Sequence, residues 1–231
     1  MKRFWKQADV VKVEDGYGVA LDGRPVRTPA RAALAVPGAA LAEAIAAEWD
    51  AQGDTINPRA MPLTGLANAA IDRVAPDSAA FAARLAAYGE SELIAYRADG
   101  PQGLLAAQAA AWDPWVDWFA RRFDAALTLT TGIMHVAQPP ETLARIRAAF
   151  AGFTPFQLAG LDPVVGITGS AVLALAVADG ELDAVAAYDI AHVDARWQEE
   201  QWGRDPLAEK AEAARRADLD AAITFLRLLA G

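Results

Sequence analysis

The pattern of apolar and polar positions divides the chain near residue 38. Before this point, apolar and polar residues alternate in short runs, as expected of half-buried strands. The dipeptides Asp15-Gly16 and Asp22-Gly23 separate these runs, and both favour type I′ turns, in which the two central residues must accept a positive φ. The pattern therefore predicts an antiparallel meander with strands over residues 10–14, 17–21, 24–28 and 34–36.

Beyond residue 38 the apolar period becomes helical. Leu41, Ile45 and Trp49 recur every four residues and give one apolar stripe. Pro62 can occupy the first turn of a second helix, over residues 62–74, because the first turn needs no amide donor at that position. Further helical patterns cover residues 79–87, 103–111, 114–123, 139–151, 155–161, 170–178, 182–202 and 206–229.

Two remaining segments complete the predicted architecture. Residues 75–78, Ala-Pro-Asp-Ser, are the best candidate for a linker, and residues 127–130, Leu-Thr-Leu-Thr, favour one more strand, with the first sheet as candidate partner. We therefore predict an α+β protein with two domains. A small antiparallel β-rich N-terminal domain with one or two helices covers residues 1–75, and a larger all-helical C-terminal domain covers residues 76–231.

Composition and charge narrow the classes of function. The net charge of −9 opposes binding to phosphate backbones, so we expect no nucleic-acid partner. The absence of cysteine excludes disulfides and thiolate catalysis. The first residues reach Gln7 and Asp9 before any apolar run, unlike a signal peptide. The most apolar window, residues 164–178, is too short and too interrupted by glycine for membrane insertion, so we expect a soluble, cytoplasmic chain.

No motif predicts catalysis. His135 and His192 have no metal-ligand spacing around them, and no glycine-rich phosphate loop occurs. The segment before Ser170 lacks the spacing of a nucleophile elbow, so Ser170 is better interpreted as a helix N-cap. We therefore expect no catalytic residue, no cofactor and no metal. An enzyme stays open only as a site assembled from distant residues, between the two domains.

One helical face carries candidate contacts for a partner. Asp194, Gln198 and Trp202 recur every four residues, so a carboxylate, an amide and an indole share a narrow stripe. Such a stripe is typical either of a half-buried helix or of a binding face, where tryptophan is often a hot spot. Trp49 is a fourth candidate, although its apolar stripe favours packing. The aromatic residues between 112 and 123 are interpreted as core.

Several short sequence blocks occur in the order and with the spacing that are typical of a known family. They are Leu21-Asp22-Gly23-Arg24-Pro25 with Thr28-Pro29, Glu48-Trp49-Asp50, Met61-Pro62-Leu63-Thr64 with Asn68 and Asp72, Tyr96-Arg97-Ala98 with Leu104 and Gln108, and finally Gln198, Trp202 and Gly203. In order and spacing the chain resembles the assembly chaperones that bind the α subunit of the F1 sector of ATP synthase. This is the family of mitochondrial ATPase assembly factor 2 and its bacterial relatives.

The resemblance implies a function of holding another protein. The chain would bind the unassembled α subunit of F1-ATPase until the β subunit replaces it, without ATP, and would be monomeric when free. The resemblance also places Asp194 at the family's acidic position, eight residues before the Trp202-Gly203 pair. It implies a bacterial cytoplasmic location, with the mitochondrial matrix as the equivalent for organellar relatives. The alternatives are a small-molecule enzyme and a permanent structural subunit of a complex.

Overall fold

The computed structural model describes residues 2–203 and 206–230. The chain divides into two compact units, each described separately here. Unit 1 consists of Met1–Ser78, Thr154–Leu161 and Ala221–Gly231, and unit 2 consists of Ala79–Phe153 and Asp162–Asp220. The predicted fold class, a small antiparallel sheet followed by a mainly helical remainder, is confirmed. The domain boundary between residues 75 and 76 stays a prediction.

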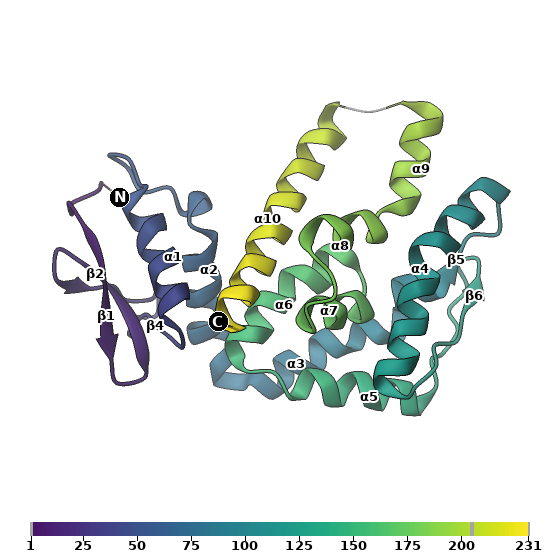
Figure 1. Cartoon of the computed structure of the whole chain (residues 1–231), viewed down its shortest axis with the longest axis horizontal. Helices are drawn as coiled ribbons and strands as arrows, with labels where there is room; N and C mark the ends of the chain where they lie inside the picture. The colour runs from purple at the N-terminus through teal and green to yellow at the C-terminus, as the bar shows by residue number, and fades with distance from the viewer. Residues whose placement is uncertain (1, 204–205, 231) are drawn as a thin grey trace. The chain divides into compact units, whose positions relative to one another are not determined.

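The sheet of unit 1 is antiparallel, as predicted, and its first three strands follow the order of a meander, whereas the fourth strand pairs with the second (Figure 1). Its strands are β1 (Ala8–Val13), β2 (Gly16–Leu21), β3 (Arg24–Pro25) and β4 (Ala35–Val36). The strand expected over residues 24–28 is therefore shorter than predicted, and β3 and β4 both pair with β2. The first turn is shifted by one residue, since Val13 pairs with Gly16 and leaves Glu14 and Asp15 as the loop.

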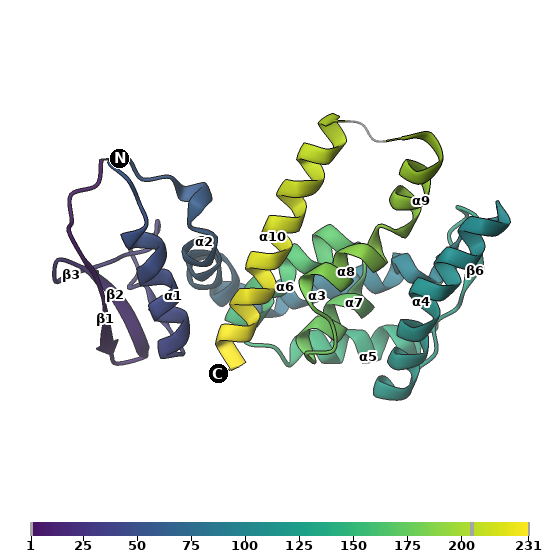
Figure 2. The ribbon, with the colours of Figure 1, turned by 45° about the horizontal axis from the view of Figure 1, so that its top comes forward.

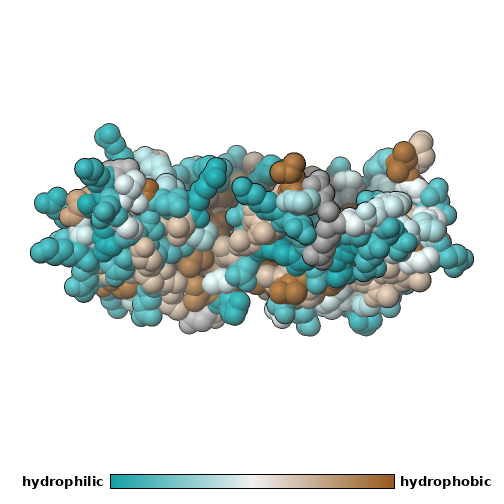
Figure 3. Space-filling model, turned by 90° about the horizontal axis from the view of Figure 1, so that it is seen from above, coloured by the Kyte–Doolittle hydropathy of each residue, from teal (hydrophilic) through white to brown (hydrophobic). Residues whose placement is uncertain are grey.

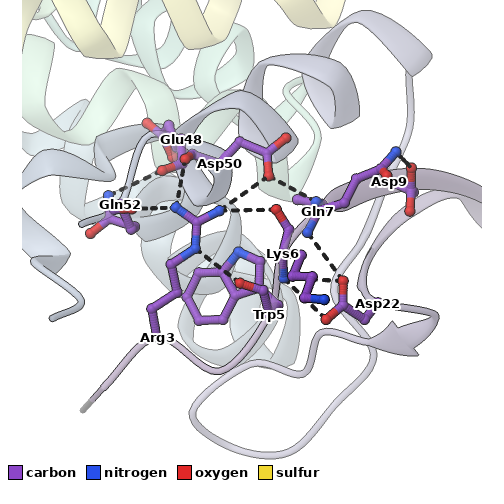
Figure 4. A network of polar contacts seen from close by, with 10 residues as sticks. Arg3, Trp5, Lys6, Gln7, Asp9, Asp22, Glu48, Asp50 and Gln52 are labelled. Carbon is purple, nitrogen blue, oxygen red and sulfur yellow. Dashed lines mark hydrogen bonds and ion pairs between the residues drawn. The ribbon is translucent and has the colours of Figure 1, made fainter. Parts of the chain in front are cut away.

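The second turn forms at the predicted residues, and backbone amides outside the turn donate hydrogen bonds to it. Asp22 and Gly23 have φ values of 47° and 79°, the positive angles that a type I′ turn requires. The carboxylate of Asp22 also accepts the amide hydrogens of Lys6 and Gln7, with N–O distances between 3.0 and 3.1 Å (Figure 4). The left-handed conformation of Asp22 is therefore supported by hydrogen bonds from two backbone amides in the segment before β1.

Helix α1 (Ala39–Asp50) packs on the sheet through the predicted apolar stripe. Leu41 and Ile45 are fully buried, and Trp49 is half-buried with its ring edge-on to Trp5 at a centroid distance of 5.2 Å. These residues join the core of unit 1, which also contains Ala8, Val19, Leu21, Val26, Leu34, Val36, Ala42, Ala46, Leu63, Ala67 and Phe225.

Arg3 connects the start of the chain to the end of α1 (Figure 4). Its guanidinium donates to the carbonyl oxygens of Trp5, Asp50 and Gln52. The Oδ1 atom of Asp50 in turn accepts the amide hydrogen of Ala8 at 2.8 Å. The polar residues around the end of α1 thus serve to fix the first strand.

The carboxylate of Glu48 joins α1 to helix α2 (Pro62–Ala69). Its Oε1 atom accepts the amide hydrogen of Leu63 at 2.7 Å, and Oε2 accepts the amide and hydroxyl hydrogens of Thr64 at 2.8 and 2.7 Å. Amides in the first turn have no acceptor inside their helix, so an anion there satisfies them and complements the helix dipole. The sequence blocks around Glu48 and Thr64 are therefore connected by hydrogen bonds that fix α2 to α1.

A second carboxylate fixes the segment after β3. Asp72 accepts the hydroxyl hydrogen of Thr28 at 2.7 Å and the amide hydrogen of Ala30 at 2.9 Å. Asp72 lies in a π-helical turn, Ala70–Val74, and a 3-10 turn, Ala75–Asp77, continues the chain into α3 (Ser78–Ala86). The segment expected to be a linker is therefore helical.

Two late segments of the chain complete the core of unit 1. Phe156, in the first part of α6 (Pro155–Thr168), stacks on Phe225, in the last part of α10 (Pro206–Ala230), with ring centroids 6.4 Å apart. A Cβ atom at Gly160 would lie 2.8 Å from the side chain of Leu226, so the close approach of these segments requires glycine. Unit 1 therefore depends on residues far along the sequence.

The core of unit 2 surrounds α7 (Ala171–Ala178), in which every residue from Ala171 to Val177 is buried. Ser170 caps this helix by accepting the amide hydrogen of Leu173 at 2.9 Å, as predicted. Unit 2 also contains most of α3, the later part of α6 and the earlier part of α10, together with α4 (Gln102–Phe123), α5 (Pro140–Ala151), α8 (Ala184–Ala191) and α9 (Val193–Trp202), and 3-10 turns at Ala87–Ser91 and Leu93–Ala95.

Three predictions about unit 2 are wrong, and the helix expected over residues 155–161 continues into this unit as far as Thr168. One helix, α4, replaces the two expected around Pro114, because buried Trp112 and Phe119 hold both halves in the core. The helix expected over residues 182–202 is divided at His192. The extended segment near residue 127 forms β6 (Thr130–Thr131), which pairs in parallel with β5 (Tyr96–Arg97) and not with the first sheet. Figures 1 and 2 show β6 beside α4.

The surface carries few large hydrophobic side chains. In the view of Figure 3, the most hydrophobic residues appear as separate spots in a largely hydrophilic surface. Among the described helices, none combines the length and the apolar character that a membrane span needs. Among the described residues, the large hydrophobic side chains with more than a third of their area exposed are Phe4, Leu129, Ile133, Met134, Val185, Trp202 and Leu207.

Candidate partner-binding site

The predicted contact residue Asp194 lies in the first turn of α9, where the helix dipole favours a carboxylate. The turn is preceded by His192, whose ring stacks on Tyr188 at a centroid distance of 3.9 Å and whose Nδ1 is 2.9 Å from the Tyr188 carbonyl oxygen. Burial lowers the pKa of His192, so the imidazole is neutral at pH 7 and donates this bond. The start of α9 is thereby fixed.

Gln108 holds the carboxylate of Asp194 in one orientation. Its Nε2 atom donates to Oδ1 of Asp194 at 2.8 Å, and its Oε1 atom accepts the amide hydrogen of Ala98 at 2.8 Å. The Gln108 side chain is 1% exposed, so it cannot easily exchange these bonds for water. Within the described residues, Oδ2 of Asp194 has no hydrogen-bond partner. One oxygen of a half-buried carboxylate is thus left available.

Asp194 and Gln108 line an open pocket of about 750 Å³ in unit 2. The pocket is therefore large enough for one or more side chains from another molecule. Its lining combines carboxylates, aromatic rings and apolar side chains: Ser91, Leu93, Tyr96, Arg97, Ala98, Asp99, Gln108, Trp112, Gly132, Ile133, His135 and Asp194.

Arg97 is the one Lys or Arg among the described residues of this lining, and it is already matched by an anion. Its Nη2 atom lies 2.8 Å from Oδ1 of Asp113, and its guanidinium lies 5.3 Å from the ring centroid of Trp112. The short contact to Asp113 lacks hydrogen-bond geometry, and Nε of Arg97 has no hydrogen-bond partner among the described residues. We therefore regard the contact as an ion pair held by charge. Trp112 is fixed by its own bond to the carbonyl oxygen of Ile190, at 2.8 Å.

One rim of the pocket is a loop with exposed apolar side chains. Ile133 and Met134 are 98% and 77% exposed. Among the described residues, no other two consecutive large hydrophobic side chains are both exposed. The loop is attached through Tyr96, whose hydroxyl lies 3.1 Å from Nδ1 of His135 and accepts the amide hydrogen of Val136 at 3.4 Å. Apolar side chains presented in this way are typical of contact surfaces.

The structure brings only one of the predicted contact residues into this pocket. Gln198 and Trp202 are exposed on α9 but do not line the pocket. Trp202 is 76% exposed and meets Trp197 edge-on at 6.2 Å, while the Trp197 indole nitrogen lies 3.4 Å from the position of a Cβ atom at Gly103. The predicted stripe therefore begins at the pocket and ends in an exposed indole.

Trp49 lies in the other unit and belongs mainly to a core. Its ring packs against the buried residues of unit 1, and its Nε1 atom is buried without a hydrogen-bond partner among the described residues. This placement agrees with the packing that its apolar stripe favours. A contact role for Trp49 stays a prediction.

Sequence reasoning missed four residues that shape the pocket. Tyr96, Arg97 and Gln108 occur in the sequence blocks that carry the family resemblance, which assign them no role, and the aromatic spacing predicts only a core position for Trp112. No short-range spacing connects Gln108 with Asp194, because 86 residues separate them. Among the described residues, no group of three His, Cys, Asp or Glu side chains could hold a metal.

Glu92 is a buried carboxyl group between two residues of the pocket lining, Ser91 and Leu93. Its Oε2 atom accepts the amide hydrogen of Val172 at 3.1 Å, and Oε1 has no partner among the described residues. Burial raises the pKa of Glu92 from 4.5 to about 7, although hydrogen bonds from Ser170 and from backbone amides oppose this shift. Folding therefore favours the neutral acid.

This shift predicts a stability that falls as the pH rises from 4.5 to about 7, because the folded state binds more protons than the unfolded chain in this window. Glu92→Gln keeps an acceptor for Val172 and removes the ionisation. At pH 8 we expect the variant to be more stable than the parent by on the order of 2–3 kcal/mol. Urea unfolding between pH 5 and pH 8 measures this difference, with Glu90→Gln on the surface as control. An equal pH dependence in parent and variant would contradict it.

Comparisons with known proteins agree on one family. A profile described as ATP12 chaperone protein matches residues 2–120. The protein named "Protein atp12, mitochondrial" of Schizosaccharomyces pombe is 26% identical over 215 residues, which are 87% of this chain and 74% of that protein.

Two solved structures are similar over almost the whole chain. The crystal structure of Atp12 from Paracoccus denitrificans is 44% identical with a TM-score of 0.95, covering 99% of this chain and 98% of that one. A crystal structure of a protein from Agrobacterium tumefaciens is 41% identical with a TM-score of 0.95, covering 99% of this chain and 86% of that one. The chain therefore belongs to the ATP12 family of chaperones, which are ATP synthase assembly factors and not enzymes.

Proposed function

We propose that this chaperone binds the unassembled α subunit of the F1 sector and shields its subunit interface until the β subunit replaces it, without ATP. The observation that supports this most is the open pocket in unit 2, where Gln108 holds Asp194 with one oxygen available. A free ring subunit exposes apolar surface, and such surface promotes aggregation. A binder present in equal amount suppresses aggregation by mass action and yields to a tighter partner.

The proposed contact residues are Asp194, Gln198, Trp202 and Trp49. Asp194 supplies a positioned charge, and Trp202 supplies a large exposed ring of the kind enriched in interface hot spots. Gln198 is exposed on the same helix and can exchange hydrogen bonds with a partner. For Trp49, the support is limited to the part of its ring that remains exposed in unit 1.

The proposal also covers the oligomeric state of the chain and its location in the cell. We propose that it is monomeric when free, because a net charge of −9 opposes self-association. We also propose the bacterial cytoplasm as its location, because the solved structures that it resembles over almost its whole length are of bacterial proteins. A permanent structural subunit remains the alternative, and it differs in one observable respect, since it would stay bound after the β subunit is added.

Light scattering of refolding α subunit tests the function. An equimolar amount of the chaperone is expected to suppress most of the scattering, equally with and without ATP, because binding and not hydrolysis provides the protection. An unrelated acidic protein of similar size is the control. Addition of β subunit should release the chaperone as a free monomer in size-exclusion chromatography. Unchanged scattering at every ratio would exclude the function, and retention after β subunit is added would favour a permanent subunit.

A further inference from the structure

We propose that the pocket of unit 2 receives a basic side chain, arginine or lysine, of the partner protein, with Asp194 and Asp99 as its anionic wall. This inference rests on the proposed function and specifies the chemistry of the surface that the chaperone recognises. Three observations carry it: the charge balance of the lining, the fixed orientation of Asp194, and the apolar rim.

The charge balance of the pocket is negative. Arg97, the one Lys or Arg that the described part of the chain contributes to the lining, is paired with Asp113 at 2.8 Å, so its charge is cancelled locally. Asp99 and Asp194 then remain as two carboxylates without an ion-pair partner in the described chain. A pocket with two uncompensated carboxylates and low-dielectric walls attracts a cation and repels an anion.

The orientation of Asp194 is set before the partner arrives. Gln108 is buried and uses both ends of its amide, one for Ala98 and one for Oδ1 of Asp194. A carboxylate fixed in this way loses little conformational entropy when a cation binds to its other oxygen. Gln108 is therefore a positioning residue for the proposed contact.

The rings and the rim suit the stem of a long basic side chain. Arginine and lysine carry several methylene groups below the charge, and these pack well on apolar and aromatic surfaces. Leu93 and Tyr96 line the pocket and are only partly buried, so they can contact such a stem, while Ile133 on the rim can contact apolar residues beside the basic one. The expected recognition element is thus a basic residue flanked by apolar residues.

A direct test uses N-acetyl-arginine methylamide as probe and the citrulline analogue as its neutral isostere. With isotopically labelled protein, we expect the arginine probe to shift the resonances of the Ala98 amide, the Gln108 side-chain amide and the Trp112 indole, and the citrulline probe to leave them in place. Asp194→Asn and Asp99→Asn should each reduce these shifts, while Asp117→Asn, an exposed change of equal charge on α4, should not. Melting curves check that each variant is folded.

The outcomes separate this inference from the proposed function. Equal shifts with both probes, shifts confined to other parts of the protein, or no shift at any soluble concentration would overturn the basic-residue pocket. Binding of the α subunit is measured on the same preparations by titration calorimetry. Parent protein that binds the α subunit but does not distinguish the probes leaves the proposed function intact, whereas probe discrimination without α-subunit binding sinks the proposed function alone.

In the complex, Asp99→Asn and Asp194→Asn should each weaken the affinity for the α subunit by about tenfold or more, as expected when one partner of an interfacial charge pair is removed. The affinity of the parent should also fall with added salt, and more steeply than that of either variant. Unchanged affinity in both variants would overturn the inference even where the free probe binds.

Discussion

Asp194→Lys is expected to abolish binding of the α subunit while the chain stays folded. The substitution places a cation in a pocket that we propose to accept a cation, so attraction becomes repulsion, and the affinity should fall by a factor of about 30 or more, or over 2 kcal/mol. Asp194 is half-buried, so the main loss to folding is its bond from buried Gln108, whose Nε2 atom would be left without an acceptor at a cost of about 1–3 kcal/mol.

The decisive measurement pairs a melting curve with a binding assay. Asp117→Lys serves as the matched control, because it makes the same change of charge at an exposed position of unit 2 outside the pocket. A stably folded Asp194→Lys variant that binds as well as the parent would remove Asp194 from the contact site. A variant that loses much of its stability but binds in its native state would assign Asp194 a role in bracing the helix.

Phe225→Ala is expected to destabilise unit 1 by about 3–5 kcal/mol, the range for removing a buried phenylalanine ring. Phe225 is fully buried, stacks on Phe156 and belongs to the same core cluster as the sheet residues Val19 and Leu21. Amide hydrogen exchange gives a local measurement: protection in β1 and β2 should fall by the corresponding factor. Phe4→Ala, at a side chain that is 57% exposed, is the control. Unchanged protection in the sheet would show that the core closes without Phe225.

The N-terminal sheet could be predicted because its signals are local. Alternation of apolar and polar residues and the Asp22-Gly23 turn act over a few residues, and the structure keeps both. The Glu14-Asp15 loop is one residue off because the apolar alternation, which fixes the register, outweighs the preference of the Asp15-Gly16 pair for a turn.

The helix boundaries in unit 2 could not be predicted from local rules. Pro114 breaks helices in isolation, yet the burial of Trp112 and Phe119 holds α4 together on both sides of it. At His192 the opposite happens. Histidine is tolerated inside helices, yet α8 ends here, and the His192 ring stacks on Tyr188. In both places tertiary contacts override the local preference.

The candidate site could be predicted only where a local pattern includes its residues. Asp194 could be singled out, because a helical stripe and a family resemblance both include it. The Gln108 bond and the Arg97–Asp113 pair could not, since the side chains of a pocket are brought together by packing and leave no periodic trace in a sequence. The roles of Glu48 and Asp72 as helix and loop anchors were hidden in the same way.

The dependence of unit 1 on α10 has a consequence for the order of folding during synthesis. The sheet residues leave the ribosome early, but the core that they build needs Phe225, Leu228 and Leu229. Until these residues emerge, the growing chain carries an amphipathic sheet with an incomplete core, which is itself prone to aggregation. This chaperone is therefore expected to need protection during its own translation, and a ribosome stalled before residue 221 should display an N-terminal unit that proteases cut readily.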